Sequence, residues 1–229
     1  MIADFTKTHR DIIFRNVIDG ASSVLDAGCG DGEKTFYISP HVQFTVGIDP
    51  DQKIIKKAIS RYRNKNLVFQ VARAESLPFS NSSFSTILFN QTLHHVSVEK
   101  QLDAIKESHR VLKYRGKLLI TEPISDSGSF GKMWRINNEV KQRKLNVINV
   151  IEAAIDTEFK LSLKKKIRIE YHCEGLGDFY NYYIETKPDT KWDENKKQDI
   201  SNKLNRCKRS SSGNFILDYS AWVWLLIKR

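Results

Sequence analysis

Residues 24–32 read VLDAGCGDG and carry the most informative pattern in the chain. An apolar run ends here in three glycines, and a helical pattern begins at Glu33. Closely spaced glycines let a backbone turn tightly and approach a ligand, and the N–H groups of a following helix face the same turn. The stretch therefore predicts a strand, a ligand-binding turn and a helix.

Apolar runs and helical patterns alternate on both sides of this turn. Strands are predicted at 22–28, 43–49, 67–73, 84–90 and 116–123, and helices at 8–19, 33–39, 51–63 and 97–112. Asp51 and Ser97 are suited to cap the last two helices. This alternation is typical of a doubly wound α/β fold, whose ligands bind outside the carboxyl ends of parallel strands.

The pattern changes after Pro123. Residues 131–158 are predicted to be mostly helical, with strands at 164–173 and 215–229, helices at 178–185 and 193–207, and a turn at 210–214. No stretch resembles an interdomain linker. We therefore expect a single domain over residues 1–229, in which 1–123 bind the cofactor and 124–229 supply a helical cap on the acceptor side and the last two strands.

The composition is that of an ordinary globular protein, with 40% hydrophobic and 28% charged residues. The net charge of +10 is spread along the chain, with +4 in residues 1–123 and +6 in residues 124–229. A basic surface attracts anions, including nucleic acid and acidic metabolites, but charge this scattered also fits a simple solvated surface.

The three cysteines, Cys29, Cys173 and Cys207, form no CxxC pair and no Cys/His pattern. Their spacing argues against a zinc site and a disulfide framework, so we expect no metal and a reducing, cytoplasmic environment. The first residues do not resemble a signal peptide, and the longest apolar run, 221–227, is too short to span a bilayer.

Three classes of ligand could use the glycine-rich turn. A nucleoside triphosphate or a dinucleotide would require glycine at position 33, where the chain has Glu33. Asp26 and Asp31 add further negative charge, and each close contact with a phosphate would cost on the order of 1 kcal/mol or more. These carboxylates disfavour both phosphate ligands.

S-adenosylmethionine, the third class, has no phosphate and carries an ammonium and a sulfonium beside its carboxylate. Asp26 can favour the cationic end, directly or through water, and the glycine N–H groups can face the neutral and anionic parts. Cys29 fits this turn as a small residue. The acidic turn therefore favours S-adenosylmethionine over the phosphate ligands.

Asp49 ends the second predicted strand, 23 residues after Asp26. An acid at this position can accept hydrogen bonds from ribose hydroxyls, as in dinucleotide-binding folds. Pro50 holds Asp49 in an extended conformation, so the side chain points away from the strand end. The alternative is that Asp49 caps the helix at 51–63, a role that Asp51 can take instead.

With these motifs in place, residues 22–123 resemble the class I, seven-stranded S-adenosylmethionine-dependent methyltransferases. The resemblance rests on VLDAGCGDG (24–32), VGIDPD (46–51), ARAESLPFSNSSFSTILFNQTLHHV (72–96) and HRVLKYRGKLLITEP (109–123). Four motifs in order are a specific signal, and they look most like the ubiquinone/menaquinone-biosynthesis C-methyltransferases. The resemblance implies a mostly parallel sheet of order 3-2-1-4-5-7-6 with the seventh strand antiparallel.

The resemblance also implies a set of cofactor-binding residues. Gly28 and Gly30, with Cys29 between them, would line the methionine end, Asp49 would bind the ribose and Pro50 would touch the adenine. The family's adenine border falls on Arg73, Ala74 and Glu75, and the backbone of Asn90 and Gln91 would face the methionine end. Arg73 departs from the family, which often has aspartate there to accept from the adenine amino group, so the main chain near Ala74 and Glu75 would hold the ring.

Methyl transfer requires a general base only if the acceptor must lose a proton. His94, His95 and Glu122 are candidates, although structural roles fit them as well, and aromatic residues 179–183 could line an acceptor pocket or pack in a core. The sequence favours a small-molecule acceptor. Two alternatives remain, an RNA or protein methyltransferase and a non-catalytic S-adenosylmethionine-binding protein, and the oligomeric state is not indicated.

Overall fold

The computed structural model describes residues 14–18, 20–125, 127–133, 138–155, 157–179, 181 and 193–229. The chain divides into two compact units. Of the described residues, those within 11–123, 137–166 and 222–229 form the larger unit, and those within 124–136 and 167–221 form the smaller unit. Two long strands, β6 (Phe159–Cys173) and β8 (Phe215–Lys228), belong partly to each unit.

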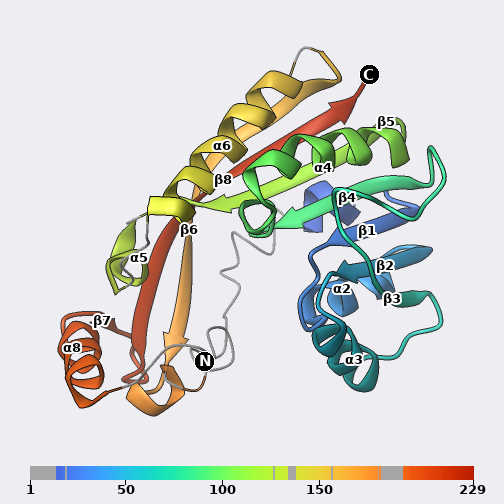
Figure 1. Cartoon of the computed structure of the whole chain (residues 1–229). Coiled ribbons are helices and arrows are strands. Elements are labelled where there is room, and N and C mark those ends of the chain that lie inside the picture. The colour runs from blue at the N-terminus through green and yellow to red at the C-terminus, as the bar shows by residue number, and fades with distance from the viewer. Residues whose placement is uncertain are drawn as a thin grey trace. The chain divides into compact units, whose positions relative to one another are not determined.

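The strands form one sheet of order β3-β2-β1-β4-β5-β8-β6, with β7 paired to β8 beside this path. The other strands are β1 (Ser23–Ala27), β2 (Phe44–Asp49), β3 (Leu67–Val71), β4 (Phe84–Asn90), β5 (Leu112–Pro123) and β7 (Lys208–Arg209). The pairs β1–β2, β1–β4, β2–β3 and β4–β5 are parallel. Figure 1 shows β8 running opposite to β5 and β6.

These observations confirm the predicted doubly wound α/β class and its strand order, with β8 as the antiparallel seventh strand of that order. The two-residue strand β7 was not predicted and brings the sheet to eight strands. β6 is the outermost strand at its end of the order, and its lysines Lys160, Lys164, Lys165 and Lys166 are exposed.

Helices connect the parallel strands of the larger unit. α2 (Glu33–Ile38) follows β1, α3 (Gln52–Arg61) follows β2, and α4 (Val98–Val111) follows β4. α6 (Asn138–Ala154) packs against α4 (Figure 1). The short helical turns are η1 (Phe14–Ile18), η2 (Ser39–His41) and η3 (Leu93–His95).

The two predicted helix caps have different outcomes. The Asp51 carboxylate accepts from the backbone N–H of Lys53 at 2.7 Å and caps α3 as predicted. Ser97 takes the N-cap position of α4, but its side chain makes no capping hydrogen bond. There the backbone carbonyl of Ser97 accepts from Lys100 N at 2.9 Å.

The core of the larger unit explains why its central strands contain few polar residues. Every residue of β1 is buried, as expected for a strand covered on both faces. The main cluster joins β1, β2, β4 and β5 to α4 and α6, and includes Leu25, Phe89, Ile105, Ile151 and Trp224. Burying each such side chain contributes about 1.5–3 kcal/mol, so this cluster holds the strand ends in place.

The smaller unit has its own core. It contains α5 (Gly128–Met133), α8 (Glu194–Leu204), β7, and the parts of β6 and β8 that lie within residues 167–221. Phe179, Ile200, Leu204 and Leu217 are buried together in it. The Asp218 carboxylate accepts from the Ser129 hydroxyl at 2.7 Å and from Arg168 Nε at 2.9 Å, which links α5, β6 and β8.

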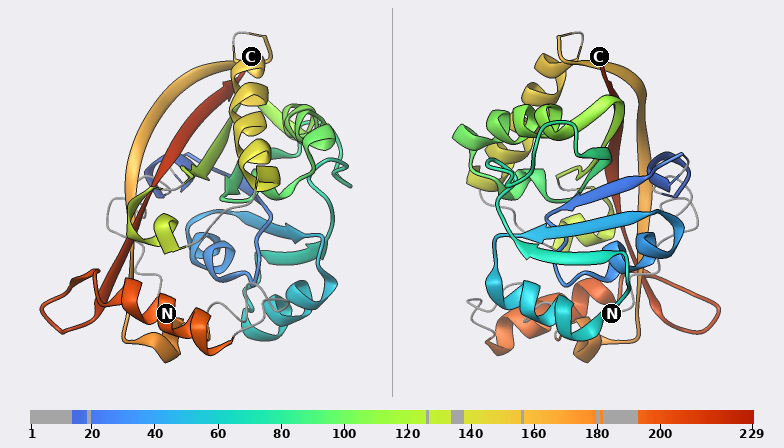
Figure 2. Two further views of the ribbon diagram at one scale, coloured as in Figure 1. Left: turned by 60° about the vertical axis from the view of Figure 1, so that its left-hand side comes forward. Right: turned by 90° about the vertical axis from the view of Figure 1, so that its right-hand side faces the viewer.

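Three predicted helices are only partly described by the structure. Within residues 8–19 only η1 is described, and within 178–185 residues 178, 179 and 181 are helical while the others lie outside the described part. Within the predicted helix at 131–158 the structure describes the end of α5 and the whole of α6. Figure 2 shows the elements from two further directions. No helix in the described ranges is long and apolar enough to cross a membrane.

Candidate functional site

The predicted site residues of the larger unit lie at the carboxyl ends of neighbouring strands. Strand register pairs Asp26 with Gly47 and with Leu88, and pairs Asp49 with Val71. It also pairs Asn90 with Thr121. The turns that follow β1, β2, β3 and β4 therefore begin at the same edge of the sheet, where ligands of this fold class bind.

Three glycines of the turn after β1 adopt positive φ angles: 80° at Gly28, 55° at Gly30 and 85° at Gly32. A Cβ at Gly28 would lie 1.9 Å from Thr92 Cγ2, and one at Gly32 would lie 2.6 Å from the Phe69 ring. A Cβ at Gly30 would meet no atom within 4 Å. Gly28 and Gly32 thus serve packing, whereas Gly30 borders open space that a ligand can occupy.

The N–H groups of this turn have partners within the protein. Gly28 N and Cys29 N both donate to the Ile48 carbonyl at 2.8 Å, and Gly30 N donates to Asp49 Oδ2 at 3.2 Å. The expectation that the glycine N–H groups face a ligand is therefore wrong for Gly28 and Gly30 in this conformation. They tie the turn to β2 instead.

Asp26 is 1% exposed, and its Oδ2 accepts from the Thr35 hydroxyl at 2.7 Å. Burial raises the pKa of Asp26 to about 6, although the Thr35 hydrogen bond and the charge of Lys34 act in the opposite direction. A side chain this deeply buried does not reach the open side of the turn. Any effect of Asp26 on a ligand therefore passes through water or through the turn.

Asp49 is half-buried and closer to the open space. Its two carboxylate oxygens accept from Gly30 N at 3.2 Å and Asp51 N at 2.9 Å. Burial raises its pKa, against the effect of these two hydrogen bonds. Because Asp51 caps α3, the alternative role of Asp49 as a helix cap is not needed, and its remaining lone pairs are available to hydroxyl groups. Pro50, which follows it, is exposed.

The stretch after β3 turns back on itself at Arg73, where Ser76 N donates to the Arg73 carbonyl at 3.2 Å. The exposed Arg73 guanidinium lies 3.6 Å from the Glu75 carboxylate. Ala74 is buried against the main core. Among the described residues, the Ala74 N–H has no hydrogen-bond partner, so it can donate to a ring nitrogen of a ligand.

Asn90 ends β4 and is 6% exposed. Its Oδ1 accepts from the Thr121 hydroxyl at 2.7 Å, while its Nδ2 has no partner in the described part of the chain. Gln91 has a φ of 59°, and its N–H donates to the Thr121 carbonyl at 2.8 Å. A buried amide donor without a partner is costly unless a ligand or water completes it.

The same site residues fall inside a region similar to known proteins. Residues 25–120 match the family model described as "Methyltransferase domain". This segment, which is less than half of the chain, is similar to a methyltransferase domain. The segment holds β2, β3 and β4, most of β1 and β5, and every predicted cofactor residue.

Curated proteins are similar to parts of the chain. The chain is 37% identical over 102 residues to the uncharacterized methyltransferase YcgJ of Bacillus subtilis, which is 43% of this chain and 40% of YcgJ. It is 28% identical over 170 residues to the phosphoethanolamine N-methyltransferase of Plasmodium falciparum, which is 72% of this chain and 60% of that enzyme. The chain thus spans about half the length of these curated relatives.

Solved structures share the fold over nearly the whole chain. The YcgJ crystal structure aligns with a TM-score of 0.62 and 23% identity, covering 93% of this chain and 96% of YcgJ. The N-methyltransferase NodS of Bradyrhizobium japonicum, in complex with S-adenosylhomocysteine, aligns with a TM-score of 0.58 and 12% identity, covering 99% of this chain and 89% of NodS. At these identities the likeness concerns the fold.

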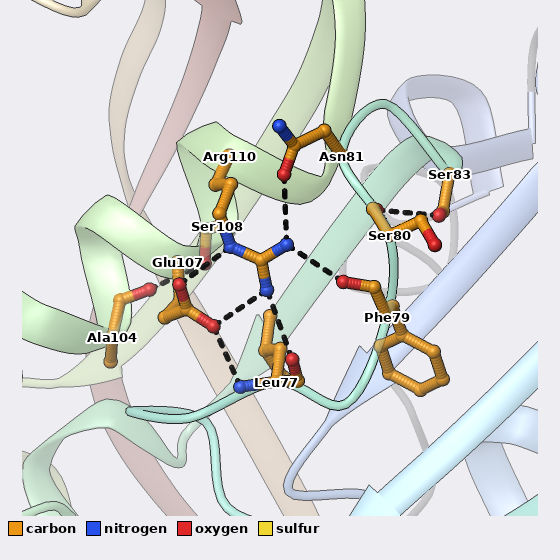
Figure 3. A network of polar contacts seen from close by, with 9 residues as sticks. All are labelled: Leu77, Phe79, Ser80, Asn81, Ser83, Ala104, Glu107, Ser108 and Arg110. Atoms are coloured by element: carbon orange, nitrogen blue, oxygen red, sulfur yellow. Dashed lines mark hydrogen bonds and ion pairs between the residues drawn. The ribbon is translucent and has the colours of Figure 1, made fainter.

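A clamp on α4 holds the loop that follows the 73–75 stretch (Figure 3). Arg110 donates to the carbonyls of Leu77 at 2.9 Å and Phe79 at 2.7 Å, and to both Glu107 oxygens. Glu107 in turn accepts from Leu77 N at 2.8 Å. The hydrogen bonds from Arg110 lower the pKa of Glu107, so this carboxylate stays charged.

His94 and Glu122 form a buried pair at the ends of β4 and β5. His94 Nδ1 lies 2.5 Å from Glu122 Oε2, and His94 N donates to Oε1 at 3.4 Å. The residues are 8% and 4% exposed, whereas the neighbouring His95 is exposed. Of the sequence-based candidates for a base, the structure therefore joins His94 and Glu122.

Several supporting residues were not predicted. Thr35 bonds Asp26, Thr92 packs on Gly28, and Thr121 bonds Asn90. Thr121 directly precedes Glu122 at the end of β5, so its position on a strand end was a usable signal. Nothing in the sequence pattern around Thr35 and Thr92 indicated their partners. Of the aromatic residues 179–183, Phe179 is fully buried in the smaller unit's core, and 180, 182 and 183 lie outside the described residues.

Proposed function

We propose that this chain transfers the methyl group of S-adenosylmethionine to a small-molecule acceptor. One observation carries the proposal: open space beside Gly30 adjoins the half-buried Asp49 carboxylate at the edge where β1 and β2 end. Asp26, Asp31 and Glu33 add negative charge to the same turn. Such a site favours a ligand with positive charge and hydroxyl groups and disfavours a diphosphate.

The assignment of cofactor contacts follows from this placement. The turn of Gly28, Cys29 and Gly30 would border the methionine end, with Asn90 and Gln91 opposite it. Asp49 would accept from the ribose hydroxyls. Pro50 and the 73–75 stretch would border the adenine, with the Ala74 N–H as a donor and the stem of Arg73 along the ring.

A small-molecule acceptor is supported by the likeness to a phosphoethanolamine N-methyltransferase. The stretch after β4 reads NQTL rather than the Asn/Asp-Pro-Pro-Tyr type motif of many amino-group methylases that act on nucleic acid or protein. The further likeness to quinone C-methyltransferases remains a prediction. Primary amines, phosphoethanolamine and a hydroquinone are therefore the first acceptors to assay.

The protein's part in such a reaction is mainly positioning. The sulfonium of the cofactor, when bound, supplies an activated methyl group. The residues at the strand ends would hold the acceptor in line with the carbon–sulfur bond, with the reacting atoms about 3–3.5 Å apart. They would also exclude water from that line.

Calorimetric titration with S-adenosylhomocysteine tests the cofactor assignment, with NAD and ATP as controls. We expect micromolar binding of S-adenosylhomocysteine alone. Binding of a control in its place, or of none of the three, would contradict the proposal. A tritiated methyl donor with the acceptors named above then tests transfer.

Two glycine variants separate folding from binding. Gly30→Ala adds a methyl group to open space at positive φ, so we expect it to cost about 1 kcal/mol of stability but to weaken S-adenosylhomocysteine binding at least tenfold. Gly28→Ala drives a Cβ into Thr92, so we expect the larger loss of stability. Unchanged binding by a folded Gly30→Ala protein would mean that the open space is not the cofactor site.

A further inference from the structure

We propose that His94, held by Glu122, is the general base of the reaction, so that the acceptor is an amine or hydroxyl group that loses a proton as it is methylated. This inference rests on the proposed function and adds the chemical class of the acceptor. It concerns a side-chain pair that the cofactor assignment does not use.

The geometry fixes which nitrogen can act. Glu122 Oε2 lies 2.5 Å from His94 Nδ1, so Nδ1 carries the proton of the neutral ring and donates it to the carboxylate. The same carboxylate accepts from the His94 backbone N–H at 3.4 Å, which fixes the ring's position. Nε2 then presents a lone pair, and among the described residues it has no hydrogen-bond partner.

The pair lies in the same contact network as the methionine-end residues. Gln91 N donates to the Thr121 carbonyl at 2.8 Å, and Thr121 Oγ1 donates to Asn90 Oδ1 at 2.7 Å. The Thr92 hydroxyl donates to the Gly28 carbonyl at 3.2 Å. Residues 90–94 and 121–122 are thus joined to each other and to the glycine turn, and the proposal places Nε2 next to the methyl group that is transferred.

The charges balance across the reaction. The acceptor's lone pair forms a bond to the methyl carbon, the carbon–sulfur bond breaks, and its electron pair stays on sulfur. The acceptor's proton passes to His94 Nε2. One positive charge therefore moves from sulfur to the imidazole, where the Glu122 carboxylate stabilises it. A buried carboxylate is costly to desolvate, and a partner that becomes positively charged during the reaction compensates that cost.

Donor analogues test the position of the pair without a known acceptor. Sinefungin has a carbon bearing an ammonium group where the cofactor has its methylated sulfur, whereas S-adenosylhomocysteine is neutral at that atom. The ratio of the two dissociation constants therefore reports charge at the reacting centre. We expect Glu122→Gln to reduce the preference for sinefungin about tenfold and Glu99→Gln, the same change at an exposed residue of α4, to leave it unchanged.

A second readout is the rate with whichever amine or hydroxyl acceptor is turned over. His94→Gln is expected to lower kcat about 100-fold or more, with little change in the KM of the donor. The assignment of His94 as the base is overturned if Glu122→Gln leaves the ratio of the sinefungin and S-adenosylhomocysteine dissociation constants unchanged. It is also overturned if a folded His94→Gln protein keeps its full kcat. Failure of the wild-type protein to bind either analogue overturns the proposed function instead, and this inference with it.

Discussion

The carboxyl group of Asp26 is enclosed by the protein and has the Thr35 hydroxyl as a donor. Its pKa rises from 3.8 to about 6 because burial disfavours the charged form. When the pKa of a carboxyl is higher in the folded state than in the unfolded state, the folded protein becomes less stable as pH rises between the two values. We therefore expect Asp26→Asn to gain stability relative to the wild type, by about 2 kcal/mol more at pH 8 than at pH 4.

Urea unfolding of both proteins at the two pH values measures this difference. Asp103→Asn is the control, because Asp103 is paired with Lys100 on the surface, and its effect should vary little with pH. A difference between Asp26→Asn and the wild type that does not change with pH would show that Asp26 titrates normally in the fold.

At this scale the sequence identified residue types better than contacts. Asp26, Asp49 and Asn90 were predicted at the strand ends, where the structure has them. The contrast between Gly28, which packs on Thr92, and Gly30, which borders open space, depends on the path of the chain after β4. The pairing of His94 with Glu122 depends on the register of β4 and β5, which no local pattern encodes.

At the level of elements, the Arg110 clamp makes α4 a support for the loop after β3 (Figure 3). Arg110→Met removes five hydrogen bonds while keeping most of the side-chain volume. Because the Arg110–Glu107 ion pair is partly exposed, we expect a loss of about 2 kcal/mol in the free energy of unfolding. Hydrogen exchange should quicken at Leu77 and through residues 77–83.

Lys100→Met on the same helix removes one exposed ion pair and serves as the matched control. Its stability should change by less than about 0.5 kcal/mol, and exchange at Leu77 should not change. If Arg110→Met left the exchange of Leu77 unaltered, the loop would be held by its own apolar contacts rather than by the clamp.

Element prediction succeeded where one periodic pattern dominated. β1, β2 and β4 were predicted within about one residue of their bounds, because each is an uninterrupted apolar run. β6 begins at Phe159 rather than at 164, since exposed Lys160 and Ser162 in an outer strand hide the alternation. β5 begins at Leu112, where its pairing with β4 shifts register, and that irregularity has no sequence signal.

For the whole molecule, β6 and β8 are continuous through both compact units. Strands shared in this way couple the folding of their two ends, so we expect the units to unfold in one transition. Leu217→Ala in the smaller unit's core should cost about 2–5 kcal/mol and lower the urea midpoint of α4 as well as that of α8. Hydrogen exchange measured at increasing urea concentrations gives the unfolding midpoint of each helix.

Tyr114→Ala, which changes an exposed residue of β5, is the control and should leave both midpoints in place. A shift confined to α8 would mean that the smaller unit unfolds independently. A single domain was predicted because the sequence contains no linker. The sequence could not indicate that two cores share β6 and β8, because each of these strands is one continuous stretch of strand-like sequence.

The lysines of β6 also bear on how the protein behaves at high concentration. An outermost strand offers unpaired backbone groups to strands of other molecules, which is a route to aggregation. Lys160, Lys165 and Lys166 are exposed along this strand, and their charges would have to be brought together and dehydrated if a second chain joined it. Acetylation of these amines removes the charge, and with it the barrier to fibril-like association.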